Sequence, residues 1–201
     1  MKENIKTSLA LMFKTVIEMV DLVDRGFNNN DIHILDRVLD KEHMIDDVER
    51  QISSSMVDLC KGLDEKETKK IVVMGQIAQN IERIGDELRC LVERIEIKIS
   101  DKLHFSDKGM SQYAEVFEKM RRSVGLVMEF MEKDKAEVLD DVLENGNEIK
   151  ELIERYRKEH VERLARGICE PRAANMYFDM LDFTGNVARH CTNIARISKG
   201  Q

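Results

Sequence analysis

The stretch IVVMGQIAQNIERIGDELRCLVERIEIKI, residues 71–99, has the most regular apolar pattern in the chain. Apolar or small residues recur three and four positions apart at Ile71, Met74, Ala78, Ile81, Gly85, Leu88, Val92, Ile95 and Ile99. This spacing places all of them on one face of an α-helix. Ile77, Ile84 and Leu91 widen the face, which predicts a helix packed against two neighbours rather than one.

The same criteria predict five further helices around this one. We expect them at about residues 5–25, 31–61 and 112–132, then up to about residue 166, and finally over 171–198. The glycines at 26, 62 and 167 are typical of helix ends, and Pro171 suits the first turn of the last helix. Asp64 with Glu67 is a capping pair for the central helix. The polar residues 100–111 are expected to break the helical pattern.

Composition agrees with an all-helical chain. The 201 residues are 42% apolar and contain one proline and no tryptophan, which is unlike the aromatic and β-branched alternation of sheet proteins. The net charge of −7, with basic and acidic residues interspersed, argues against nucleic-acid binding. The sequence has no window of 18 apolar residues, so we expect no membrane insertion. Four scattered cysteines suit a reduced cytoplasmic compartment, with their thiols as small core residues.

The chain also matches itself at a constant offset of 104 residues. The clearest match pairs Leu35, Asp36, Val38 and Leu39 with Leu139, Asp140, Val142 and Leu143. An offset of 100 continues the match through the third and sixth helices, where Gly85 pairs with Gly185 and Arg89 with Arg189. Short connectors between long helices favour antiparallel neighbours. We therefore predict two tandem three-helix bundles, residues 1–100 and 101–201.

Two pairs of carboxylates are spaced one helical turn apart and are the candidate ligands. Glu82 and Asp86 share one helix face, and Glu42 and Asp46 share a face of the preceding helix. If the pairs face each other, their hard oxygen ligands suit a divalent or trivalent metal. If the apolar seam of the second helix follows Leu35, Val38, Ile45, Ile52, Met56 and Leu59, both Glu42 and Glu49 fall in register with apolar positions. In the alternative interpretation all these carboxylates are simply solvated.

Catalytic motifs are not evident in the sequence. A di-iron enzyme of the helical-bundle type needs Glu-x-x-His on two helices, a nucleophile elbow needs Gly-x-Ser-x-Gly, and neither pattern occurs. His190 is interpreted as a packing or surface residue. A metal-dependent enzyme using the four carboxylates is a weaker alternative, as is a plain dimerising scaffold that forms a homodimer.

These features together resemble the PhoU family of phosphate-uptake regulators. The resemblance depends on the two three-helix repeats and on two acidic motifs, Asn80-Ile-Glu-Arg-Ile-Gly-Asp86 and Glu42-x-x-Ile45-Asp46-x-x-Glu49. Within that family, the second half looks most similar to the PhoU-like domain of bacterial sodium/phosphate cotransporters. The runs that carry this similarity are His160-Val-Glu-Arg-Leu-Ala-Arg-Gly167, Tyr177-Phe-Asp-Met-Leu181 and Asn193-Ile-Ala195.

The resemblance implies a cytoplasmic, non-enzymatic regulator of phosphate transport. Its implied partners are a phosphate transporter subunit or the transporter's own membrane domain, together with a sensor kinase, and its place is the inner face of the membrane. Iron or another metal is the implied cofactor, held in the first repeat by Glu42, Asp46, Glu82 and Asp86. The second repeat departs from this pattern, with Gly146 and Lys150 at the first pair's places and Asn186 in place of the last aspartate.

Overall fold

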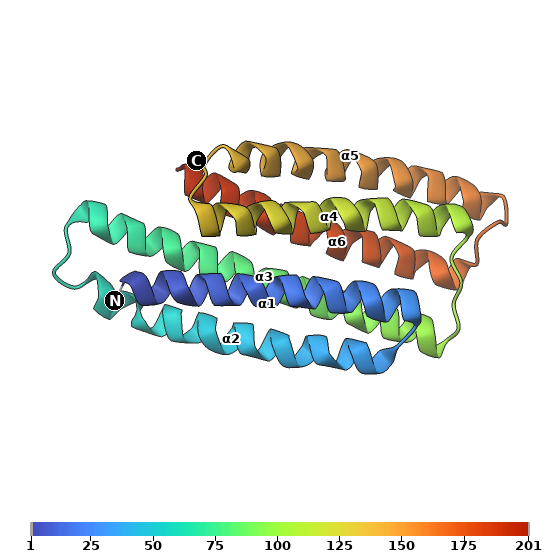
Figure 1. Ribbon diagram of the computed structural model, residues 1–201. Coiled ribbons are helices and arrows are strands. Elements are labelled where there is room, and N and C mark those ends of the chain that lie inside the picture. Colours follow the sequence, from blue (N-terminus) through green and yellow to red (C-terminus); the bar gives the residue numbers. More distant parts are fainter. Residues whose placement is uncertain (1, 201) are drawn as a thin grey trace.

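Residues 2–200 are described by the computed structural model, with side chains from Ile5 onward, and within them the chain forms six α-helices and no strand (Figure 1). The helices are α1 (Lys2–Asn29), α2 (Ile32–Cys60), α3 (Glu65–Ser100), α4 (Asp107–Lys133), α5 (Val138–Ala165) and α6 (Pro171–Lys199). Each helix runs antiparallel to the next along the chain (Figure 1). The expected all-α fold is confirmed. No helix in the described part of the chain has an apolar stretch long enough to span a membrane.

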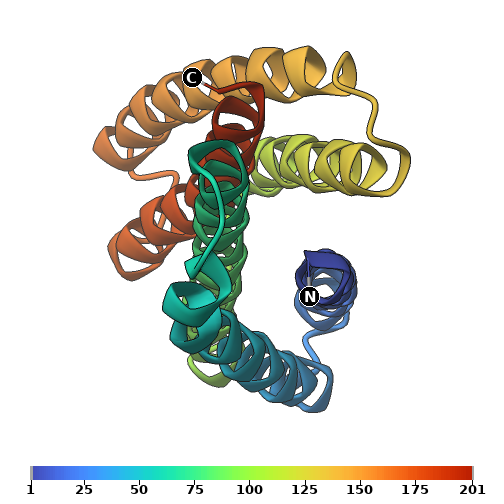
Figure 2. The ribbon, with the colours of Figure 1, turned by 90° about the vertical axis from the view of Figure 1, so that its left-hand side faces the viewer.

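The helices pack in two groups that meet along α3 and α6. Helices α1, α2 and α3 contact one another, and so do α4, α5 and α6. The most extensive contact of all is between α3 and α6, and α1 also touches α4. Figure 2 shows α3 beside α6 in the middle of the molecule, with α1 and α2 on one side and α4 and α5 on the other.

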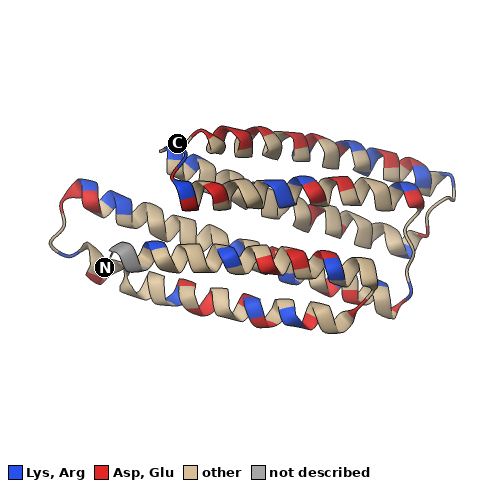
Figure 3. Ribbon diagram, in the orientation of Figure 1, with Lys and Arg blue, Asp and Glu red and all other residues tan. Residues whose placement is uncertain are grey.

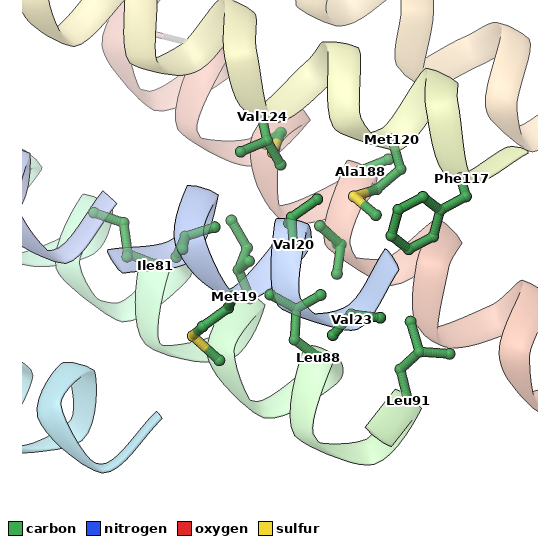
Figure 4. Close-up of a cluster of buried hydrophobic side chains, with 14 of the residues drawn as sticks. Met19, Val20, Val23, Ile81, Leu88, Leu91, Phe117, Met120, Val124 and Ala188 are labelled. Atoms are coloured by element: carbon green, nitrogen blue, oxygen red, sulfur yellow. The ribbon is translucent and has the colours of Figure 1, made fainter. Parts of the chain in front are cut away.

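One apolar core runs through both groups. Val20 of α1, Leu88 of α3, Met120 of α4 and Ala188 of α6 lie in the same buried cluster (Figure 4). The apolar face predicted for residues 71–99 is buried as expected, apart from its Met74 and Ile99 positions, which are only half-buried. The regular spacing of α3 therefore creates the surface against which helices of both groups pack.

Side-chain caps mark the starts of α2, α3 and α4. Asp64 Oδ1 accepts the Glu67 backbone N–H at 2.8 Å, which confirms the predicted capping of α3. The fourth helix was expected from residue 112 but begins at Asp107. The polar residues before it contain the N-terminal cap of α4, because Ser106 Oγ accepts the Gly109 N–H at 3.2 Å.

The end of α1 also differs from the expectation. Gly26 was predicted to end the helix, yet α1 continues through it to Asn29. A Cβ at Gly26 would lie 2.4 Å from Leu35 Cδ2, so this glycine allows α2 to pack closely rather than ending a helix. The chain turns at Asn30, with φ +50°. By contrast, Gly62 and Gly167 have φ of +75° and +69°, as glycines after a helix end do.

The four cysteines are all described and all are free thiols. Cys191 is buried, but Cys60, Cys90 and Cys169 are only half-buried. The expectation that these thiols are core residues is therefore confirmed for Cys191 and wrong for the three half-buried cysteines, of which Cys60 packs against the core and Cys169 lies between α5 and α6.

Candidate functional site

The acidic candidates of the first half lie on facing surfaces of α2 and α3. Glu42 belongs to the buried stripe of α2 and is only 6% exposed. It packs over Gly85 of α3, where a Cβ would be 3.8 Å from Glu42 Cγ. The predicted register with the apolar seam is confirmed for Glu42, whereas Glu49 is only half-buried. The alternative that every one of these carboxylates is solvated is wrong for Glu42.

Arg89 supplies the positive charge next to Glu42. Its Nε donates to Glu42 Oε1 at 3.2 Å, and its two other nitrogens donate to Asp86 at 3.5 Å and to Glu93 at 2.8 Å. His43 Nδ1 lies 3.3 Å from the second Glu42 oxygen. One guanidinium therefore joins a buried carboxylate of α2 to two carboxylates of α3, and such charge-assisted contacts are among the stronger hydrogen bonds in proteins.

Asp46 and Glu82 have different surroundings. Asp46 accepts from Arg50 of its own helix at 3.3 Å. Glu82, by contrast, has no ion-pair partner within 4 Å among the described side chains. Burial, together with the negative charges of Asp86 and Asp46, raises the pKa of Glu82 from its ordinary 4.5 to about 7. Burial also raises the pKa of Glu42, with Arg89 opposing the shift.

This arrangement, called the acidic face below (Glu42, Asp46, Glu82 and Asp86), can hold a proton at Glu82 near neutral pH. In the described part of the chain, no three His, Cys, Asp or Glu side chains stand together as a metal-binding group. The position between Glu42 and Asp86, where a cation would sit, is taken by the Arg89 guanidinium. The residues therefore do not fit a metal ion as they are arranged. Metal binding by these four residues stays a prediction, which elemental analysis of the purified protein tests.

Sequence reasoning missed the role of Arg89. The signal was present, since Asp86, Arg89 and Glu93 are spaced by three and four residues on one helix face. That spacing identifies the partners within α3. The partner on α2 depends on how the two helices are aligned, which helix periodicity alone does not give.

Both histidines of the buried interior are packing residues. His190 Nδ1 contacts Asn80 Oδ1 at 3.1 Å between α6 and α3, and His160 stacks on Tyr177 with ring centroids 4.4 Å apart. Burial lowers the pKa of each histidine to about 4. Both are therefore neutral at physiological pH, and the interpretation of His190 as a packing residue is confirmed.

Comparison with known proteins shows where this helical architecture also occurs. The sequence model of the PhoU domain family matches residues 9–95, from α1 to near the end of α3. The crystal structure of PhoU from Pseudomonas aeruginosa superposes with a TM-score of 0.89 at 17% sequence identity, covering 99% of this chain and 97% of that one. The chain has the PhoU fold. The phosphate transport system regulatory protein PhoU from Streptococcus pneumoniae superposes with a TM-score of 0.85 at 11% identity, over 99% and 95% of the two chains. A search of curated proteins finds no match.

Within this PhoU fold, the second half keeps only one of the four acidic residues at the matching positions. Asp182, which matches Glu82, forms an ion pair with Arg157 of α5. Asn186, which matches Asp86, donates to Glu87 of α3 at 3.1 Å. Elsewhere Lys and Arg are interspersed with Asp and Glu along the helices (Figure 3). The acidic face is therefore a feature of α2 and α3 that α5 and α6 do not repeat.

Proposed function

We propose that this protein regulates phosphate transport by binding other proteins and does not itself catalyse a reaction. The observation that carries the proposal is the PhoU fold over nearly the whole chain, together with the match of residues 9–95 to the PhoU domain. The Streptococcus pneumoniae protein of the same fold is named as a regulatory protein of a phosphate transport system. A regulator of this kind needs a surface for a partner rather than an active site.

Two features of the interior support a non-catalytic role. The buried histidines have lowered pKa values and are used in packing. Cys191 is completely buried, and burial raises the pKa of its thiol to about 12, so it is a poor nucleophile at neutral pH. These groups stabilise the fold instead of facing a substrate.

The proposed partners are a phosphate transporter subunit, the membrane domain of a sodium/phosphate cotransporter, or the sensor kinase that reports phosphate supply. We place the contact in the cytoplasm, at the inner face of the membrane. Val57 and Val161 support a contact surface on the outer sides of α2 and α5. They occupy matching positions at the offset of 104 residues, and they are 73% and 55% exposed.

We further propose that the chain consists of two repeats of one PhoU domain, residues 1–100 and 101–201. The match to the family is confined to residues 9–95, which is about the length of one repeat. The three helices within each half contact one another, which also supports this division.

Deleting the gene in the source organism tests the proposed function. The rate of radiolabelled phosphate uptake should then lose its normal dependence on external phosphate, and the wild-type gene should restore it. Uptake that responds normally in the deletion strain would exclude the proposal.

Photo-crosslinking in cells tests the partner. A crosslinking amino acid at position 57 or 161 should capture a phosphate transporter component or its kinase, whereas the same amino acid at the exposed Lys135 in the loop between α4 and α5 should not. Capture of only unrelated proteins from both valine positions would remove this surface from the proposal.

A further inference from the structure

A groove with a volume of about 540 Å³ lies between α5 and α6. Its lining residues all belong to these two helices, from Gly146 to Arg157 on α5 and from Asp182 to Arg196 on α6. Its volume falls within the range of roughly 300 to 1,000 Å³ that small-molecule sites occupy. The groove is thus distinct from the acidic face on α2 and α3.

Positive charge predominates in this groove. Its charged lining residues are the cations Lys150, Arg157, Arg189 and Arg196 and the carboxylates Glu154 and Asp182. Cations therefore outnumber carboxylates by two at one place in a chain whose net charge is −7. Because the protein as a whole repels anions weakly, a local excess of positive charge is a specific feature of the groove.

Two of the cations are available to a ligand. Arg157 is neutralised by its ion pair with Asp182. Lys150 and Arg196 are exposed, and neither has a carboxylate within 4 Å among the side chains that the structure describes. Unpaired cations that line one groove on facing helices are suited to a shared anion.

Arg189 is a third cation with little direct compensation. Its Nε donates to the Asn186 side chain at 3.4 Å. The nearby Glu87 of α3 accepts from the same asparagine at 3.1 Å. Burial raises the pKa of Glu87, and the Asn186 hydrogen bond and the charge of Arg189 oppose that shift. This carboxylate is thus engaged at the side of the groove by Asn186 and does not form an ion pair with a groove cation.

At three matching positions the second half lacks a carboxylate of the first half, and at two of them it carries a cation instead. Three acidic residues of α2 and α3 are replaced in α5 and α6: Glu42 by Gly146, Asp46 by Lys150, and Glu96 by Arg196. These exchanges remove carboxylates and add two cations, which favours an anion in the groove, while Arg189 keeps the charge of its match Arg89.

Gly146 also shapes the groove. A Cβ at this position would lie 2.4 Å from Thr192 Oγ1, so α5 approaches α6 closely there. The residue that matches the buried Glu42 consequently has no side chain, and the lining has neither a carboxylate nor any bulk at this point.

We propose that the groove between α5 and α6 binds a small phosphate-bearing anion through Lys150, Arg189 and Arg196. Arginine and lysine both bind phosphate oxygens through charge-assisted hydrogen bonds. The choice of phosphate chemistry rests on the proposed function. The same chemistry could be supplied by free inorganic phosphate, so the test has one arm for each source.

Isothermal titration calorimetry on the purified full-length protein tests the site, using ATP in one arm and inorganic phosphate in the other. A chelator is included so that no metal bridges the ligand to the acidic face. Binding should weaken about tenfold or more in Lys150→Gln and in Arg196→Gln, as expected for the loss of a hydrogen bond to a charged group. Glu154→Gln should tighten binding, a gain that structural damage does not produce.

Lys158→Gln is the matched control, because Lys158 is an exposed cation of α5 that does not line the groove. It should leave the affinity unchanged. Binding of phosphate alone would identify free phosphate as the ligand, and binding of ATP alone would identify a nucleotide. The proposal is overturned if neither ligand binds below about 1 mM, or if Lys158→Gln weakens binding as much as the groove variants do. The proposed function is tested separately, by phosphate uptake and crosslinking in cells. Failure of ligand binding and failure of the proposed function can therefore be told apart.

Discussion

Replacing Glu82 by glutamine should stabilise the protein at alkaline pH. The pKa of Glu82 is raised from 4.5 to about 7 by burial and by its carboxylate neighbours. An acid with a higher pKa in the folded chain favours folding most at low pH. That contribution is complete below pH 4.5 and is lost as the pH rises through 7, because the charge must then be kept in the half-buried site.

The size of the effect follows from the pKa values. Raising the pKa of one acid from 4.5 to about 7 costs at most about 3.4 kcal/mol at high pH. Water around this partly exposed side chain screens the charge, so we expect about 1 to 2 kcal/mol. Glutamine has no charge to bury and should restore this amount at pH 8, but only a few tenths of a kcal/mol at pH 5.

Urea unfolding of wild type and Glu82→Gln at pH 5 and pH 8 measures this difference. Other groups titrate in both proteins, so the comparison between the two pH values isolates Glu82. At pH 8 the melting temperature should also rise by about 2 to 8 °C. Glu151→Gln, at an exposed site on α5, should change neither quantity. A variant that is equally stable or less stable than wild type at pH 8 would refute the reasoning.

Four further substitutions, in two pairs, test the packing of the helices. Arg89→Met should lower the free energy of unfolding by about 2 kcal/mol at pH 8, because it leaves the buried Glu42 without its cation. The control Arg50→Met, at an exposed ion pair, should lower it by less than about 1 kcal/mol. Equal effects of the two substitutions in urea unfolding would contradict this account. Gly26→Ala should destabilise by about 1 to 2 kcal/mol, because its Cβ would meet Leu35. Gly125→Ala should instead stabilise the protein by about 0.5 to 1 kcal/mol, because a Cβ at this position has no neighbouring atom within 4 Å. Calorimetric melting temperatures that shift in the same direction for both alanine variants would be inconsistent with these contacts.

The helices were predictable because each carries a long periodic apolar face. The pattern of residues 71–99 locates α3 and most of its buried positions, including Ile81 and Leu88. Helix ends were less predictable, because they depend on single contacts. Gly26 allows α2 to pack closely instead of ending α1, and the start of α4 is capped by one serine hydroxyl. Neither contact changes the apolar periodicity of the sequence, so the pattern does not reveal it.

The candidate site was predictable in its members but not in their partners. Spacing within a helix correctly places Glu82 near Asp86 and identifies Glu42 as a seam residue. It does not show that Arg89 reaches across to Glu42, since the alignment of two helices is set by packing over the whole interface. The groove between α5 and α6 was also missed, although Gly146 and Lys150 were recognised as departures from the acidic pattern.

The extensive contact between α3 and α6 has a consequence for synthesis of the protein. Helix α3 ends at Ser100, whereas α6 is complete only at Lys199. At about 5 to 20 residues per second, roughly 5 to 20 s separate the emergence of these two helices from the ribosome. During that interval the side of α3 that later faces α6 is uncovered. Nascent chains on neighbouring ribosomes can then associate with one another through this apolar surface. We expect such chains to depend on chaperones until translation ends.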